Sequence, residues 1–241
     1  MSAKRITIDS KLLRQYSSRS KKRAPKKIRY RILIVCEGIA TEPNYFRSIE
    51  RKYGAGLVYE LTIQGEGANT VQVVDKAIEL QAKASPKYDS VWAVFDKDSF
   101  TDNSFNAAIR KAKSNGIECA WSNEAFELWY LYHFHNRVTA MSRTEYKKSI
   151  SDAVNRSAHY RGRKPYQYEK NATDTLDILQ KYGSQDNAIK WAEAQSLTFT
   201  DTKFAKHNPC TMVFKLVRQL IGEDEAFNKL VKEKIESGAV E

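Results

Sequence analysis

The sequence contains few cysteines and no long apolar run. Its 241 residues include Cys36, Cys119 and Cys210, and none of these forms a CxxC pair. This spacing argues against a disulfide framework and against a structural zinc site. The longest apolar runs, such as residues 32–36, are far too short to span a bilayer. We therefore expect a reduced, cytoplasmic protein with no secretory signal and no membrane association.

Acidic residues are almost missing from the N-terminal stretch. Residues 1–31 contain 12 Lys and Arg and one acid, Asp9, whereas residues 32–241 contain 28 basic and 28 acidic residues. We interpret residues 1–28 as a basic, flexible arm in which Lys21, Lys22 and Arg23 neutralise nucleic-acid phosphates. The alternative interpretation is a solvated terminus that only aids solubility.

The sequence also lacks the glycine-rich phosphate loop GxxxxGK[ST], and Gly65-Glu66-Gly67 is too short to replace it. Apolar strand-like runs instead alternate with helical patterns, which predicts an α/β fold with a mostly parallel sheet flanked by helices. The expected strands are 31–36, 58–64, 90–95 and 117–121, and the expected helices are 41–53, 70–84, 104–115 and 123–135. This α/β domain covers residues 29–135. We expect a helical and loop insertion at 136–207 and C-terminal helices at 208–241 that pack back on the domain.

Carboxylates follow two of the predicted strands. Glu37 comes directly after the first strand, and Asp96 and Asp98 follow the third. If these strands are neighbours, the three carboxylates converge at one edge of the sheet. An extended Asp96–Asp98 segment would point both side chains the same way. Such oxygen ligands suit Mg²⁺ or Mn²⁺, which could activate water for phosphodiester cleavage, although each motif alone also fits an ordinary turn.

The motifs in these segments resemble a known metal site and a known family. The runs ILIVCEG-x3-E at 32–42 and VFDKD at 94–98 resemble the Toprim metal site. Together with CEGIATEPNYF, SNEAFELWYLYHF and NPCT, in that order, they resemble the RloB-like family over about residues 31–221. The sequence departs from the family pattern at Glu124, where a proline is expected, and at Cys210, where serine is more usual.

The resemblance implies a role for each matching carboxylate. Glu37 corresponds to the Toprim glutamate, a metal ligand or general acid–base. Asp96 and Asp98 correspond to the DxD metal ligands, and the fold implied for residues 29–135 is a Toprim-like catalytic domain. Glu42 serves either a second metal ion or only as an acid facing the helix macrodipole.

Two further residues are weaker catalytic candidates. On the helix expected at 123–135, Asn123 and Glu127 are four residues apart and would share one face, as a site wall or as a buried polar brace. Lys206 could neutralise charge in the transition state.

A second basic segment lies within the insertion. Residues 156–170 interleave cations with aromatic rings, which is typical of binding to a flexible nucleic-acid strand. The alternative is a basic surface loop. The candidate nucleic-acid-binding residues here are Arg156, Tyr160, Arg161, Arg163 and Lys164.

These features favour a metal-dependent nuclease, and the resemblance implies that it acts as an antiphage abortive-infection effector. The resemblance favours RNA, such as tRNA, over DNA as the substrate, and it implies a partner ATPase of the ABC or AAA type. Two alternatives stay open at this point. The chain could be a non-catalytic nucleic-acid-binding module of a defence complex, or an enzyme that transfers nucleotidyl or phosphate groups at the same metal site.

Overall fold

The computed structural model describes residues 30–53, 59–65, 70–98 and 100–237. The predicted basic arm, with Lys21, Lys22 and Arg23, lies outside these residues. Within them, every helix is too short or too polar to cross a membrane.

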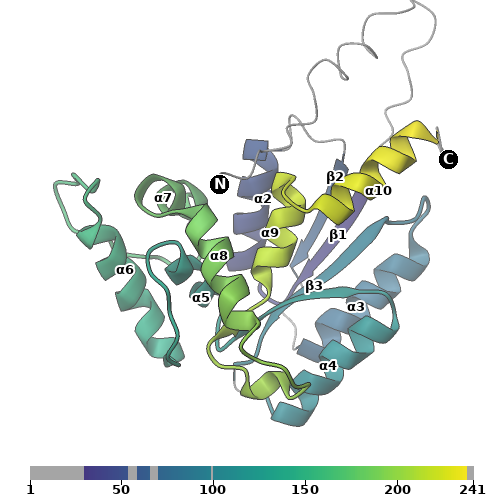
Figure 1. The fold of residues 1–241 in the computed structure, drawn as a ribbon, viewed down its shortest axis with the longest axis horizontal. Helices are drawn as coiled ribbons and strands as arrows, with labels where there is room; N and C mark the ends of the chain where they lie inside the picture. Colours follow the sequence, from purple (N-terminus) through teal and green to yellow (C-terminus); the bar gives the residue numbers. More distant parts are fainter. Residues whose placement is uncertain (1–29, 54–58, 66–69, 99, 238–241) are drawn as a thin grey trace, which may run out of the picture.

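An α/β sheet forms the centre of the molecule, as predicted (Figure 1). Its strand order is β2-β1-β3-β4-β5, and the first four of these strands run parallel. The fifth is a two-residue strand that pairs antiparallel with the end of β4 and was not predicted. The strands are β1 (Tyr30–Cys36), β2 (Tyr59–Gly65), β3 (Ser90–Asp96), β4 (Glu118–Asn123) and β5 (Cys210–Thr211).

Strand β1 is buried on both faces because it is central and almost wholly apolar. Its side chains alternate between two clusters. Leu33 and Val35 pack with helices α3 (Thr70–Lys83) and α4 (Asp102–Ser114). Ile32 and Ile34 pack on the opposite face with helices α2 (Thr41–Tyr53) and α9 (Val213–Ile221). Figure 1 shows these helices covering the two faces of the sheet.

The chain changes direction across the sheet between β1 and β3. From β1 it passes through α2 to β2 on one side, and from β3 it passes through α4 to β4 on the other. Helices α2 and α4 consequently lie on opposite faces, which opens a crevice at the carboxyl ends of β1 and β3. The predicted carboxylate motifs stand at this switch point.

The segment expected to be one helix at 123–135 is divided between a strand and a short helix. Asn123 ends β4, where it pairs with Cys210 of β5, and its side-chain amide donates to the Ala205 carbonyl at 3.0 Å. Helix α5 therefore begins only at Glu127 and ends at Tyr132. The prediction of one long helix was wrong because the backbone of Asn123 pairs with β5, a strand far along the chain.

The later helices cover the α2 side of the sheet and extend beyond it (Figure 1). They are α6 (Tyr146–Arg156), which the sequence analysis did not identify, α7 (Thr175–Tyr182), α8 (Gln185–Ser196), α9 and α10 (Glu225–Glu236). One continuous cluster of buried side chains joins the α/β region to these helices, with Ile34, Tyr146 and Val217 among its members. The boundaries proposed at 135 and 207 stay predictions.

Candidate functional site

Glu37 and Asp96 meet at the carboxyl edge of the sheet. The amide of Glu37 donates to the Val94 carbonyl at 2.9 Å and so continues the β1–β3 pairing by one residue. The amide of Asp96 donates to Glu37 Oε2 at 3.0 Å. The expectation that these two strands are neighbours is therefore confirmed, and it brings the two carboxylates together.

The Asp96 carboxylate is buried and only partly satisfied. Its side chain accepts from the amide of Phe126, but Oδ1 has no hydrogen-bond partner. Burial raises the pKa of Asp96 well above its usual value, and the charges of Glu42 and Glu127 add to that rise. A buried carboxylate oxygen without a donor is costly for a folded protein unless the site is kept for another purpose.

Glu42 lies in the first turn of α2 and is also buried. Its pKa is raised by burial first and by the charge of Glu127, while its own backbone amide and the Lys170 charge lower it. Gly38 leaves the room that the Glu42 carboxylate occupies, because a β-carbon at position 38 would overlap Glu42 Oε2. The helix-terminus interpretation and the metal interpretation of Glu42 both fit this placement.

Glu37 is less buried than Asp96, and its pKa is raised to about 7. Burial is the largest cause, and the charges of Glu42 and Asp98 contribute in the same direction. The Asp96 amide and the Arg143 guanidinium act in the opposite direction. Glu37 can therefore exchange a proton near neutral pH.

Asp98 departs from the extended conformation that the sequence predicted. Its φ is +37°, in the left-handed region, so the expected parallel alignment with Asp96 is wrong. Asp98 is more exposed than Asp96, and its Oδ2 lies 2.5 Å from Nη1 of Arg143. The amide of Asp98 donates to the Glu124 carbonyl at 3.2 Å, which fixes this turn against the segment after β4.

Glu127 joins the cluster without Asn123. Because Asn123 belongs to β4 and Glu127 to α5, the predicted shared helix face is wrong. Glu127 is buried, and its Oε1 accepts from the Tyr168 hydroxyl at 3.3 Å. Its charge contributes to the raised pKa values of Asp96 and Glu42, so it is close to both.

A cavity of about 410 Å³ opens onto these carboxylates. Glu37, Glu42 and Asp96 line it together with two cations, Arg143 and Lys170. Arg143 was not among the residues predicted from the sequence, because it lies in the turn before α6 and belongs to no recognisable motif.

One wall of this cavity is a segment that returns from α6 and binds along α2. The Thr41 hydroxyl donates to the Lys170 carbonyl at 2.8 Å, and the Asn44 amide donates to the Asn171 carbonyl at 3.0 Å. The Ser48 hydroxyl donates to the Thr173 carbonyl at 3.2 Å. These donors lie at helical spacing on one face of α2, so residues 170–173 form a strap held to that helix.

Lys206 lies apart from the lining of this cavity. Its side chain is exposed, and its Nζ lies 2.6 Å from Asp102 Oδ2 at the start of α4. This places Lys206 on the α4 side of the sheet edge. Its catalytic role stays a prediction, and no contact with the carboxylate cluster supports it.

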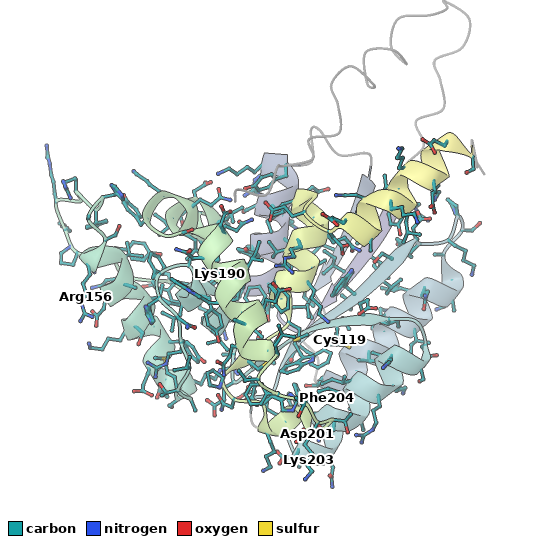
Figure 2. The ribbon with its side chains drawn as sticks, viewed as in Figure 1. Cys119, Arg156, Lys190, Asp201, Lys203 and Phe204 are labelled. Atoms are coloured by element: carbon teal, nitrogen blue, oxygen red, sulfur yellow. The ribbon has the colours of Figure 1, made fainter. Side chains whose placement is uncertain are left out.

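The basic loop lies at the far end of α6 from Arg143. Arg156 ends α6 and is largely exposed, and Figure 2 shows it at the outer limit of the molecule. The Tyr160 hydroxyl donates to the Lys164 carbonyl at 2.7 Å, and its ring packs on Tyr182. Arg161, Arg163 and Lys164 are exposed. These cations could bind an extended strand, whereas Tyr160 is already engaged within the protein.

A larger cavity of about 770 Å³ lies on another side of the molecule, beside β4. Figure 2 labels two of its lining residues, Asp201 and Phe204, well away from Arg156. Two pairs of its polar groups neutralise each other: His207 Nε2 lies 2.9 Å from Asp201 Oδ1, and Arg218 pairs with Glu193 at 2.5 Å. The smaller carboxylate cavity is the better candidate for chemistry, because it contains the unpartnered Asp96 oxygen.

The donor set of the carboxylate cavity suits a hard dication. The oxygens of Glu37, Glu42 and Asp96, which line the cavity, are the ligand type that Mg²⁺ and Mn²⁺ prefer, and Asp96 Oδ1 is buried without a donor. In the part of the chain that the structure describes, no three His, Cys, Asp or Glu side chains are grouped as a preformed metal site.

Comparison with known proteins identifies a family. Neither the curated proteins nor the solved structures contain a match to the chain. The RloB family, described as RloB-like protein, matches residues 32–220, which run from within β1 to within α9 and include all the carboxylates of the cluster. The chain is therefore a member of the RloB-like family.

Proposed function

We propose that this protein is a metal-dependent nuclease with a Toprim-like catalytic domain. The observation that carries the proposal is the buried, unpartnered Asp96 Oδ1, which lies among acidic side chains at the switch point of a parallel sheet. Buried carboxylates without a hydrogen-bond donor contribute little to the stability of a fold, because removing their charge from water is costly. Their arrangement at the carboxyl ends of adjacent strands is the usual place for chemistry in such folds.

Glu37, Asp96 and Asp98 would hold Mg²⁺ or Mn²⁺, with Glu42 available for a second ion. The dication would supply charge for a phosphate oxygen and a lowered pKa for a bound water. It would also relieve the mutual repulsion that, together with the larger effect of burial, raises the pKa values of Glu37, Glu42 and Asp96. The fit rests on the Asp96 oxygen that lacks a donor.

The chain's own residues supply the remaining steps. Glu37, whose pKa in the metal-free protein is raised to about 7, would take a proton from the attacking group or return one to the leaving oxygen if it acts as the general acid–base and leaves the metal to the other carboxylates. Glu127, held by the Tyr168 hydroxyl, lies close to Asp96 and adds negative charge there. The strap at 170–173 contributes Lys170 and Asn171 to the cavity lining on the α2 side.

The family resemblance supports the biological part of the proposal. The substrate is RNA, with tRNA favoured over DNA, and the protein acts in the cytoplasm as an antiphage abortive-infection effector. An ABC- or AAA-type ATPase is the partner that would hold the nuclease inactive until infection.

Induced expression in bacteria tests the proposal directly. Wild type and Asp96→Asn are compared, with Asp186→Asn on the exposed surface of α8 as the matched control. We expect wild type and the control to arrest growth and to fragment total RNA, with genomic DNA intact, whereas Asp96→Asn does neither. If the ATPase partner represses the nuclease, the same comparison is made with purified protein, RNA and Mg²⁺. If Asp96→Asn cleaves RNA as fast as wild type does, the catalytic assignment is overturned.

A second candidate function is a non-catalytic nucleic-acid-binding module of a defence complex. The Arg143–Asp98 ion pair favours it, because it neutralises part of the carboxylate cluster with the protein's own charge. This candidate predicts RNA binding that is the same with Mg²⁺ and with EDTA, and no cleavage in either. Purified protein and labelled RNA distinguish the two functions in one titration.

A further inference from the structure

Arg143 is a half-buried cation placed among the carboxylates. Its Nη1 lies 2.5 Å from Asp98 Oδ2, and 37% of its side chain is exposed. The charges of Asp96, Asp98 and Glu127 all act on it, and it in turn lowers the pKa values of Glu37 and Glu42. It is therefore in electrostatic contact with all five acidic residues of the cluster.

The backbone of Arg143 is held in place independently of this ion pair. Its amide donates to Glu124 Oε2 at 2.9 Å, and the turn that carries it is closed by a capping box between Ser142 and Glu145. The guanidinium can consequently move at the end of its side chain while its origin stays fixed. This arrangement permits a change of partner without a change of fold.

The guanidinium has two suitable types of partner in this cavity. Its planar set of donors matches a carboxylate and a phosphate equally well in shape. Arg143 lines the same cavity as Glu37 and Asp96, so a phosphate that approaches those carboxylates comes close to Arg143. In the structure, the guanidinium forms an ion pair with the Asp98 carboxylate.

The Asp98 carboxylate cannot bind Arg143 and a dication with full strength at the same time. A dication held by Asp98 draws charge away from the ion pair, and at this short range it also repels the guanidinium. We propose that Arg143 exchanges partners: it pairs with Asp98 while the carboxylates hold no dication, and it binds a phosphate of the nucleic-acid strand once Asp98 has turned to the metal. This inference rests on the proposed metal site and assigns Arg143 as a substrate-positioning residue.

Lys170, the other cation that lines the cavity, is expected to act differently. Its charge lowers the pKa of Glu42, and its carbonyl is bound by Thr41 in the strap. Among the residues that the structure describes, the ion pair of Asp98 is with Arg143 and not with the ammonium group of Lys170. A competition with the metal at Asp98 is therefore specific to Arg143.

Metal binding without nucleic acid tests the first half of the exchange. Mn²⁺ alone is titrated, with calorimetric or electron-paramagnetic detection, into wild type, Arg143→Ala and Arg143→Lys. Arg218→Ala, which breaks another half-buried arginine ion pair, is the matched control. We expect Arg143→Ala to bind Mn²⁺ about tenfold more tightly than wild type, because a competing charge is removed. Arg143→Lys and the control should stay close to wild type.

RNA binding at saturating metal tests the second half. A short single-stranded RNA is titrated in Ca²⁺, which occupies oxygen sites and limits cleavage. We expect Arg143→Ala to bind the RNA about tenfold more weakly than wild type, since a charge-assisted pair is lost. Arg143→Lys should fall between the two, because it keeps the charge and loses the fork.

The exchange predicts that one variant, Arg143→Ala, binds Mn²⁺ more tightly than wild type and binds RNA more weakly. Mn²⁺ affinity that is unchanged or lower in Arg143→Ala overturns the exchange, and so does unchanged RNA affinity in Ca²⁺. Thermal unfolding of each variant without metal shows whether it folds, and Arg143→Gln, which also removes the charge, replaces the alanine variant in both titrations if that variant does not fold. The nuclease proposal fails separately, if wild type binds Mn²⁺ and RNA as expected but cleaves nothing.

Discussion

At the scale of one residue, the buried Asp96 carboxylate lowers the stability of the fold. Its carboxylate is buried, one of its oxygens has no donor, and three other acids raise its pKa. Folding therefore has to keep this group either protonated or unfavourably charged. A substitution that removes the charge of Asp96 and keeps its side-chain shape shows whether the carboxylate is needed for stability or for function.

The first prediction concerns Asp96→Asn. Without metal, we expect its free energy of unfolding to equal or exceed that of wild type, by about 1 kcal/mol, because the variant buries no charge. RNA cleavage should fall to background. Urea denaturation and a cleavage assay measure the two effects. A variant that is much less stable than wild type would show that the carboxylate is structural.

The second prediction concerns Glu37 and pH. Its folded-state pKa is about 7, above the ordinary 4.5, so between these values the folded protein binds more protons than the unfolded chain. The contribution of Glu37 to stability is then fully present below pH 4.5 and is lost as the pH rises through 7. In metal-free buffer, Glu37→Gln should remove this pH dependence, on the order of 2 kcal/mol between pH 5 and 8.

Thermal unfolding of wild type and Glu37→Gln across that pH range measures the effect. Glu79→Gln is the control, since Glu79 is an exposed carboxylate on α3 whose pKa is lowered by Lys83 and Lys76. Parallel curves for wild type and Glu37→Gln would contradict the raised pKa of Glu37.

At the scale of elements, the parallel strands were predictable from the sequence because their signal is local. Strand β1 needs a continuous apolar run to be buried on both faces, and the sequence shows that run directly. The same runs carry Glu37 and Asp96 at their ends, so their convergence could be predicted as well. Elements that depend on distant partners were missed: β5 exists only by pairing with β4.

The missed part of the site has the same physical origin. Arg143 reaches Asp98 from 45 positions along the chain, and Tyr168 reaches Glu127 across 41. Neither residue lies in a pattern that spacing alone can identify. Conversely, Lys206 lies just before the NPCT motif at 208–211, but the fold pairs it with Asp102.

The third prediction concerns the turn between β1 and α2. Gly38→Ala would place a methyl group where Glu42 Oε2 lies, so Glu42 has to leave its position. The variant should fold, since a carboxylate is flexible and Gly38 is not recorded with a positive φ. We expect a several-fold loss of Mn²⁺ affinity and of cleavage rate. Gly183→Ala is no suitable comparison, because its β-carbon would meet backbone atoms.

Gly222→Ala is the better control for this prediction. It lies after α9, away from the carboxylate cavity, and a β-carbon there meets no other atom. Its φ of +77° makes alanine strained, so the variant should lose stability, by about 1 kcal/mol, without losing Mn²⁺ affinity. If Gly38→Ala binds Mn²⁺ as wild type does, Glu42 has no part in the metal site.

At the scale of the whole molecule, positive and negative charge are separated along α6. Arg143 and the carboxylates lie near the start of this 11-residue helix, and the basic loop follows its end, about 16 Å further along the helix axis. The strap then returns the chain from the loop to the cavity. A nucleic-acid strand cut at the carboxylates could therefore continue toward the exposed cations of the loop.

The last prediction tests that path through salt. Each phosphate contact that is lost lowers the slope of log affinity against log salt by about 0.7 for a single strand. Replacement of Arg161, Arg163 and Lys164 by alanine should lower the slope by about 2 for a long RNA, with Ca²⁺ present. The matched control replaces three exposed basic residues of α4, on the opposite face of the sheet: Arg110, Lys111 and Lys113.

The cleavage assay adds an internal control, because substrate length separates binding along the loop from chemistry at the cavity. A dinucleotide cannot reach from the carboxylates to the loop, so the loop variant should cleave it at the wild-type rate. A long RNA should be cleaved more slowly by the loop variant, and the difference should shrink as salt is added and the loop charges are screened. Equal losses on both substrates would mean that the loop supports the fold of the site, and equal salt slopes for the loop variant and the α4 control would remove the loop from the substrate path.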